Sequence, residues 1–163
     1  MLSCRSSVLS QMNKTKKDYF FVALQLLLFL CFVFASDLYQ FPFPKILQIL
    51  GLIFSVLGLL IILLAIFQLS DALTPFPSPK SGASLKTNGL YQFVRHPIYT
   101  GILIFCFAWT CHTGALSQLL VSVSLYVLFL YKSRYEEERL VQVYGEAYVI
   151  YQKRVGRFFP KIG

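Results

Sequence analysis

The sequence has little charge. Only 13% of its 163 residues are Asp, Glu, Lys or Arg, and only seven residues are acidic. A soluble domain needs a charged surface, whereas 56% of this chain is hydrophobic and its mean hydropathy is +0.64. The composition excludes an ordinary soluble fold and indicates an all-α integral membrane protein.

The chain is also poor in residues that bind metals. Its four cysteines have no ligand-like spacing, and three of them lie in apolar runs, where cysteine behaves as a small hydrophobic residue. His112 follows Cys111 without a second ligand at metal spacing, so we expect an interfacial polar residue there. The sequence predicts neither a disulfide framework nor a metal site.

Acidic residues are fewer than basic ones, which gives a formal net charge of +8. The basic residues do not form the single patch that nucleic acid would require. They lie between apolar runs, as in membrane proteins whose cytosolic loops are basic. We therefore expect contact with membrane lipids and none with nucleic acid.

Two uncharged runs precede the middle of the chain. Residues 19–36 would form a helix of about 27 Å, enough to cross a hydrocarbon core. Residues 46–70 form a longer run that contains Gly51 and Gly58, where another helix can approach closely. Each run predicts one transmembrane helix.

A third uncharged run, residues 98–131, would be about 51 Å long as one helix, too long for an upright span. We expect it to break at the polar turn 111–114 and to form a hairpin. Four spans would place every Lys and Arg except Lys45 on one face. The sequence thus predicts four transmembrane helices with both termini in the cytosol.

The predicted parts are an uncleaved cytosolic tail (1–18), two transmembrane helices (19–70) and a core (71–163). The core starts with a proline-rich loop and continues with the hairpin 98–131. Beyond Tyr131 the helix should extend into water, because Glu, Arg and Leu are good helix formers. An amphipathic helix on the membrane surface, kinked at Gly145, should follow and end at Pro160.

A polar cluster lies just before the hairpin. Pro97 suits the first position of a helix, which places His96 near its N-terminus and Tyr99 one turn later. A helix N-terminus favours an anionic group, and Arg95 adds donors suited to a carboxylate or phosphate. Gly101 would allow a ligand or another backbone to approach closely. These residues alone fit a cytosolic anchor as well as a binding site.

Three of the seven acids are consecutive, at 136–138, about one turn beyond the cytosolic end of the fourth span. Because a hairpin brings its ends together, Glu136 and Glu137 should lie close to His96 and Tyr99. Carboxylates at this point could hold an ammonium group or ribose hydroxyls.

Basic residues flank this acidic cluster. Arg134 could hold a carboxylate. The alternative is a solvated acidic turn whose glutamates pair with Arg134 and Arg139 on the same helix.

The spacing of these residues is recognisable. The pattern Gly-x-Tyr-x-x-x-Arg-His-Pro-x-Tyr-x-Gly over 89–101 is followed by the pair Glu136-Glu137, by Gly145 and by a basic, aromatic tail. With this spacing, residues 71–160 resemble the isoprenylcysteine carboxyl methyltransferase family and its bacterial relatives, which are similar to the phospholipid N-methyltransferases.

The resemblance implies a membrane methyltransferase that uses S-adenosyl-L-methionine, with the cofactor covered by the C-terminal segment. Carried over by position, the cofactor-binding residues would be Arg95, His96, Pro97, Tyr99, Gly101, Glu136 and Glu137. Arg134 would be a catalytic residue that orients an acceptor carboxylate. The acceptor would be lipophilic, with a prenylcysteine-like carboxylate or another lipid head group. Gly156 follows Arg154-Val155, where prenylcysteine enzymes commonly have proline.

Two other functions are compatible with the hairpin. A membrane sterol or enone reductase that uses NADPH has a related Pro-x-Tyr-x-Gly segment, but its glycine is typically followed by glutamate, and here Ile102 follows Gly101. A non-catalytic membrane subunit would keep the hairpin for packing alone.

Overall fold

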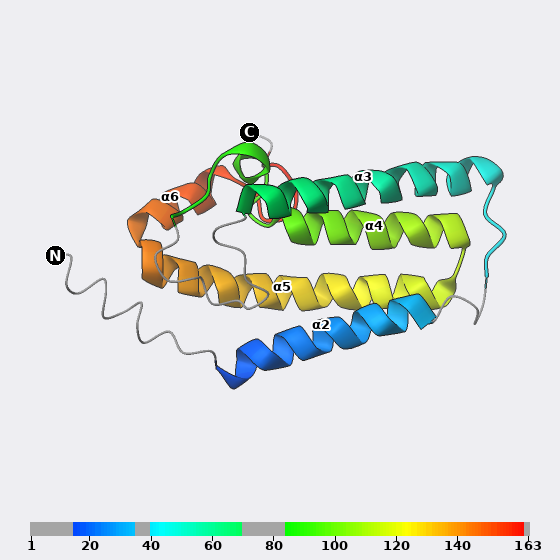
Figure 1. The fold of residues 1–163 in the computed structure, drawn as a ribbon, viewed down its shortest axis with the longest axis horizontal. Helices are drawn as coiled ribbons and strands as arrows, with labels where there is room; N and C mark the ends of the chain where they lie inside the picture. The colour runs from blue at the N-terminus through cyan, green and yellow to red at the C-terminus, as the bar shows by residue number, and fades with distance from the viewer. Residues whose placement is uncertain (1–14, 35–39, 70–83, 162–163) are drawn as a thin grey trace.

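The computed structural model describes residues 15–34, 40–69 and 84–161 of the chain (Figure 1). These residues contain five α-helices, labelled α2 to α6 as in Figure 1, and one short 3₁₀ helix, labelled η2. The elements are α2 (Lys16–Phe34), α3 (Lys45–Leu69), η2 (Gly89–Gln92), α4 (Pro97–Thr113), α5 (Leu116–Tyr144) and α6 (Glu146–Arg154). Most of the predicted N-terminal tail, the end of the first predicted span and most of the proline-rich loop lie outside the described residues.

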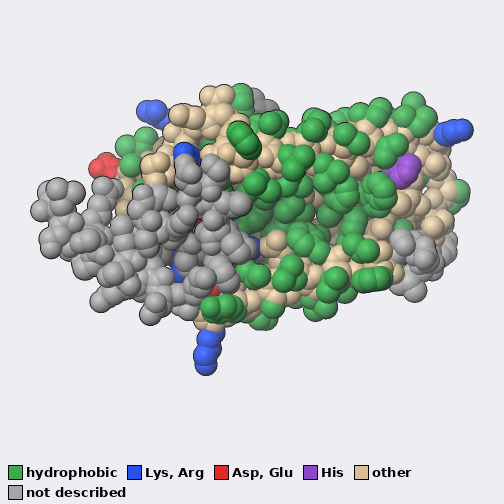
Figure 2. All heavy atoms as spheres, viewed as in Figure 1, with side chains coloured by type: hydrophobic (Ala, Val, Ile, Leu, Met, Phe, Trp, Pro, Cys, Tyr) green, Lys and Arg blue, Asp and Glu red, His purple; other side chains and the backbone are tan. Residues whose placement is uncertain are grey.

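Helices α2, α3, α4 and α5 lie side by side (Figure 1). Figure 2 shows that hydrophobic side chains cover much of these helices on the face toward the viewer. Among the described helices, α2, α3 and α5 are long and apolar enough to cross a membrane. The protein is therefore an all-helical, multi-pass integral membrane protein. With 17 residues, α4 is about 26 Å long. A fourth span formed by α4 stays a prediction.

Glycines let α3 and α4 pack backbone against backbone. A Cβ atom added to Gly51 would lie 2.6 Å from the carbonyl oxygen of Ala108. One added to Gly58 would lie 2.7 Å from the backbone nitrogen of Phe105 and 2.8 Å from the carbonyl oxygen of Gly101. The predicted close approach at Gly51 and Gly58 is confirmed, because neither position has room for a side chain.

Substituting Gly58 with alanine is expected to lower the free energy of unfolding by about 1–3 kcal/mol, because the added methyl group forces α3 and α4 apart. Thermal unfolding in detergent micelles measures the change. Leu59→Ala is the matched control, since Leu59 is 45% exposed on the outer face of the same helix. Equal stability of both variants would contradict the packing assigned to Gly58.

The hairpin breaks inside the predicted turn. Helix α4 ends at Thr113, and Gly114 adopts a positive φ of 72° that favours glycine. The carbonyl oxygen of Gly114 accepts a hydrogen bond of 2.8 Å from the backbone N–H of Phe41, which ties the turn to the segment before α3. Helix α5 then runs beyond Tyr131 to Tyr144, as predicted.

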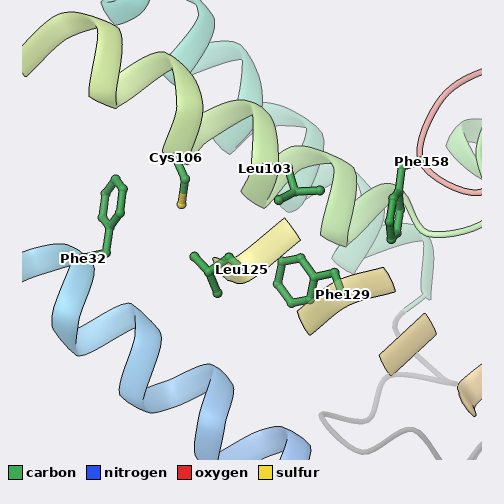
Figure 3. Close-up of a cluster of buried hydrophobic side chains, with 6 residues drawn as sticks. All are labelled: Phe32, Leu103, Cys106, Leu125, Phe129 and Phe158. Atoms are coloured by element: carbon green, nitrogen blue, oxygen red, sulfur yellow. The ribbon is translucent and has the colours of Figure 1, made fainter. Parts of the chain in front are cut away.

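Apolar side chains from three helices and the C-terminal segment meet in one core. In Figure 3, Phe32 of α2 points toward α4, where Cys106 and Leu103 lie, and Leu125 and Phe129 of α5 lie beside them. The buried members of this core are Phe32, Leu103, Cys106, Leu125, Phe129 and Phe158. The described cysteines, Cys31, Cys106 and Cys111, are free thiols. Because Phe158 lies in this core, the C-terminal segment is fixed to the helical bundle.

The break predicted at Gly145 is present, with a φ of 61° between α5 and α6. The sequence predicted that the apolar side of this helix would face the membrane surface. In the structure it faces the protein. Tyr148, Tyr151 and Val155 are buried in a protein cluster that also includes Leu85. Burial raises the pKa of Tyr151 to about 12, so its hydroxyl stays protonated and donates to the carbonyl oxygen of Tyr91. Helix α6 therefore packs against the loop before α4.

Candidate active site

The polar motif lies where α4 begins. His96 is the residue before the helix, and Pro97 occupies its first position, where a missing N–H costs nothing. Both side chains are buried. The loop that leads to them is anchored on α3, because Gln68 Oε1 accepts a 2.9 Å hydrogen bond from the backbone N–H of Leu90. The segment that leads into α4 is thus attached to α3.

The C-terminal segment returns to this point and runs parallel to the motif. Val94 and Gly156 form a parallel bridge, in which the N–H of Arg95 donates to the carbonyl of Gly156 at 2.8 Å. The N–H of His96 donates to the carbonyl of Arg157 at 3.1 Å. These bonds join residues about sixty positions apart and lay the segment over the N-terminus of α4.

Glu137 is the centre of the polar contacts. Its Oε1 accepts from Arg95 Nε at 2.9 Å and from His96 Nε2 at 3.0 Å. Its Oε2 accepts from Arg157 Nη2 at 2.7 Å and from Gln152 Nε2 at 3.3 Å. The residue is 4% exposed, and both of its oxygens are engaged. A buried carboxylate with these partners connects α5 to the motif, to α6 and to the C-terminal segment.

Glu136 has a different environment. Its Oε2 accepts a 3.1 Å hydrogen bond from the hydroxyl of Tyr99 and lies 3.7 Å from His96 Nδ1. Its side chain is 25% exposed, compared with 5% for Glu137. An ionised carboxylate can accept about four hydrogen bonds. Glu136 therefore keeps acceptor capacity for a ligand, whereas Glu137 is committed to the protein.

Stacked rings form one wall of the cluster. The ring of Tyr99 stacks on His96 with centroids 5.4 Å apart and on Phe129 with centroids 4.6 Å apart. Phe158 of the C-terminal segment meets His96 edge-on at 6.1 Å. The orientation of Tyr99 and His96 is thus fixed by packing as well as by hydrogen bonds.

An apolar cavity of about 360 Å³ adjoins the cluster. Its lining comes from α4, α5 and the C-terminal segment, and consists of Thr100, Leu103, Ile104, Phe107, Tyr126, Phe158 and Phe159. Thr100 Oγ1 donates to the carbonyl of Phe158 at 3.0 Å, which fixes the rim of the cavity. Because Phe158 contacts both the His96 ring and the cavity, a polar and an apolar compartment meet at this residue.

The prediction that His96 and Tyr99 lie close to Glu136 and Glu137 is confirmed. The solvated-turn alternative is wrong for Glu137, which is buried. In that alternative, Arg139 would pair with the glutamates. In the structure, Arg139 forms an ion pair with Asp18 of α2 at 3.3 Å.

Other predicted residues do not join the cluster. Arg134 is exposed, and no described contact links it to the cluster. Gly101 packs against α3, where an added Cβ would lie 2.7 Å from Ile62 Cγ1. Gln152 and Arg157 were not predicted as parts of the site, because only the path of the C-terminal segment brings them to Glu137.

Residues 46–147 match the family model described as phospholipid methyltransferase. That range covers more than half of the chain and includes α3, the motif at the start of α4, and both glutamates of the cluster. The match thus contains the motif at 89–101, the glutamate pair and Gly145, whereas the basic, aromatic tail lies beyond it.

Two curated relatives are methyltransferases by name. Methanethiol S-methyltransferase of Pseudomonas deceptionensis is 35% identical over 100 residues, which are 61% of this chain and 37% of the relative. Protein-S-isoprenylcysteine O-methyltransferase of Schizosaccharomyces pombe is 32% identical over 135 residues, 81% of this chain and 57% of the relative. This chain therefore spans less than two thirds of the length of either relative.

A solved structure of the eukaryotic intramembrane Ras methyltransferase, isoprenylcysteine carboxyl methyltransferase, has a similar fold. The TM-score is 0.65 at 21% identity, over 93% of this chain and 55% of that chain. The predicted resemblance is confirmed, and methyltransferases of this group use S-adenosyl-L-methionine. The family match covers more than half of the chain, and the fold and both of these relatives agree with it: the chain belongs to the phospholipid methyltransferase family.

Proposed function

We propose that this chain transfers a methyl group from S-adenosyl-L-methionine to a lipophilic acceptor at the cytosolic face of a membrane. The observation that carries the proposal is the junction at Phe158, where the Glu136 cluster meets the apolar cavity. A polar cofactor and an apolar acceptor could meet there without either entering the other's compartment. The cytosolic assignment rests on the basic residues that flank the predicted spans.

The described residues suit this cofactor. S-adenosyl-L-methionine has an ammonium group and ribose hydroxyls. Both are hydrogen-bond donors, and the Glu136 carboxylate could accept their hydrogen bonds. Tyr99 and His96 would orient Glu136 from one side. When bound, the cofactor supplies an activated methyl group on a sulfonium. The described residues thus offer hydrogen-bond acceptors to the donor groups of the cofactor.

The remaining residues of the motif would act indirectly. Arg95 and Glu137 would hold the C-terminal segment closed over the site, and Pro97 would fix the start of α4. Gly101 would serve helix packing, and Arg134 would take no part in orienting the acceptor. In this proposal the core 71–163 is catalytic, and the helices of 19–70 support it.

Methyl transfer from a sulfonium is an in-line displacement, so the protein's main task is to align two reactants. A carboxylate acceptor is already ionised and needs no base. An acceptor that carries a proton would need one, and His96 could provide it: if Nε2–H donates to Glu137, the lone pair of Nδ1 remains. The geometry supports both classes of acceptor head group.

The size of the cavity supports an acceptor with a large apolar part. A volume of about 360 Å³ lies within the range of roughly 300–1,000 Å³ typical of pockets for drug-sized ligands. Methanethiol, the compound in the name of one relative, has two heavy atoms and would leave most of this space empty. We therefore propose a lipid or a lipidated molecule as the acceptor.

The test is to incubate the purified protein with S-adenosyl-L-methionine carrying an isotope-labelled methyl group, together with either a membrane lipid extract or methanethiol. The label is expected in the organic lipid fraction, on molecules heavier by one methyl group. Transfer to methanethiol alone would overturn the proposed acceptor class. NADPH added in place of the cofactor serves as the control for reductase activity.

Filling the cavity should separate the two acceptor classes further. Ile104→Trp is expected to lower kcat/KM for a long-chain acceptor by about tenfold, since a hydrophobic pocket discriminates by about 10- to 200-fold for small changes in size. Transfer to a small thiol should be unchanged. Leu119→Trp, on the exposed side of α5, is the control. An unchanged kcat/KM for the long acceptor would show that it does not occupy this cavity.

A further inference from the structure

Lys132 is a buried lysine beside the candidate site that the motif does not include. It is 2% exposed, and its Nζ donates a 2.6 Å hydrogen bond to Oε1 of Gln25 on α2. Nζ also lies 5.4 Å from the centre of the Tyr99 ring. A buried ammonium group is costly unless anions and acceptors surround it, and inside a membrane bundle such a residue usually has a function.

Lys132 precedes Glu136 by four positions on α5, so both side chains lie on one face of the helix. Their charges attract each other. Tyr99 touches both residues, because its ring lies beneath the ammonium and its hydroxyl donates to Glu136. The three side chains form one unit, and Gln25 ties this unit to α2.

The two arginines of the described cluster face Glu137. Arg95 and Arg157 both form ion pairs with it. His96 Nε2 also lies 3.0 Å from it. Within the described residues, the groups that face Glu136 are His96 Nδ1 just before α4, Tyr99 of α4, and Lys132 and Glu137 on α5 itself. Glu137 repels a charge on Glu136, so a cation must offset that repulsion as well as the effect of burial.

We propose that Lys132 is a positioning residue that keeps Glu136 in its charged form, and that Gln25 holds the ammonium group in place for this task. A partly buried carboxylate takes up a proton more readily when no cation lies beside it. It then loses half of its acceptor character and donates a hydrogen bond instead. Lys132 would thereby determine whether Glu136 can accept hydrogen bonds from a bound ammonium or hydroxyl group.

Infrared spectroscopy tests the charge of Glu136 without any ligand. Lys132→Met at neutral pH is expected to gain the carbonyl band of a protonated carboxylic acid, and the double variant Lys132→Met/Glu136→Gln should lack this band. Lys132→Arg should resemble the wild type, because it restores the positive charge. The proposal is overturned if Lys132→Met gains no band, or if the wild type already has a band that Glu136→Gln removes.

The variants must be folded for this comparison, which circular dichroism of the helices establishes. If Lys132→Met does not fold, Lys132→Gln provides the same test, since it keeps a donor for Gln25 but has no charge. The expected band and the outcomes that overturn the proposal are identical for this variant.

A second readout rests on the proposed function and uses S-adenosylhomocysteine as the probe. Lys132→Met should bind it about tenfold more weakly than the wild type near pH 7, and the affinity should recover as the pH rises above neutral and Glu136 regains its charge. A weakening that is the same at every pH would indicate a merely structural role. If the wild type itself does not bind, the proposed function fails, while the infrared result still decides the role of Lys132.

Discussion

Replacing Glu137 with alanine is expected to lower the free energy of unfolding by about 3–5 kcal/mol, the cost of removing one partner from a buried charge network. Without Glu137, the guanidinium groups of Arg95 and Arg157 would face each other with no anion between them. The C-terminal segment would then lose its strongest attachment to α5. Thermal unfolding in detergent micelles measures the effect, together with the rate of proteolysis after residue 154.

Glu138→Ala is the matched control for this experiment. Glu138 is the next residue on the same helix, carries the same charge and is exposed. Its loss should leave both the unfolding temperature and the proteolysis rate close to those of the wild type. Equal stability of Glu137→Ala and Glu138→Ala would contradict the role of Glu137 as the centre of the network.

Glu136→Gln is expected to weaken the binding of S-adenosylhomocysteine by about 10- to 100-fold, because a hydrogen bond to a charged group contributes about 1.5–3 kcal/mol. Glutamine keeps the size of the side chain but replaces one acceptor oxygen with a donor. The unfolding temperature should fall less than in Glu137→Ala, since the one hydrogen bond that the described residues give Glu136, from Tyr99, can still form with glutamine, and Lys132 keeps its bond to Gln25. Calorimetric titration measures the affinity.

The comparison between the two glutamates distinguishes the roles assigned to them. In Glu136→Gln, affinity falls and the unfolding temperature falls only slightly, whereas in Glu137→Ala both fall strongly. Glu138→Gln should match the wild type in both measurements. If Glu136→Gln binds as the wild type does, another residue must hold the cofactor.

The sequence was sufficient to predict the hairpin and the meeting of its ends. An uncharged run too long for one span, with a single polar turn inside it, left few alternatives, and the distribution of Lys and Arg favoured a hairpin. The contacts of His96 and Tyr99 with Glu136 and Glu137 followed from that topology. The glycine packing between α3 and α4 was likewise predictable, because small residues recur within an otherwise bulky apolar run.

The rotation of α5 about its axis could not be predicted. Arg134 and Lys132 are two positions apart, which places them about 200° apart around the helix. The run before them is apolar on every side, so no periodicity indicates which face is inward. Packing against α2 and α4 turns Lys132 inward and Arg134 outward. Arg134 therefore lies on the outward face of α5, and its role in orienting an acceptor stays a prediction.

The different roles of Glu136 and Glu137 were also beyond prediction. They depend on the C-terminal segment, whose Arg157 reaches Glu137 through a bridge between residues 94 and 156. Such a contact depends on the complete path of the chain rather than on local spacing. The same path explains why the apolar stripe of α6 is buried against the loop at Leu85 instead of facing lipid.

In the proposed function, the cluster around Glu136 binds S-adenosyl-L-methionine. Calorimetric titration of S-adenosylhomocysteine into the folded, detergent-solubilised wild-type protein measures this binding. Saturable binding at one site per chain is expected, weakened in Glu136→Gln and unchanged in Glu138→Gln. Absence of binding to wild-type protein whose helical content and cooperative unfolding have been verified would contradict it.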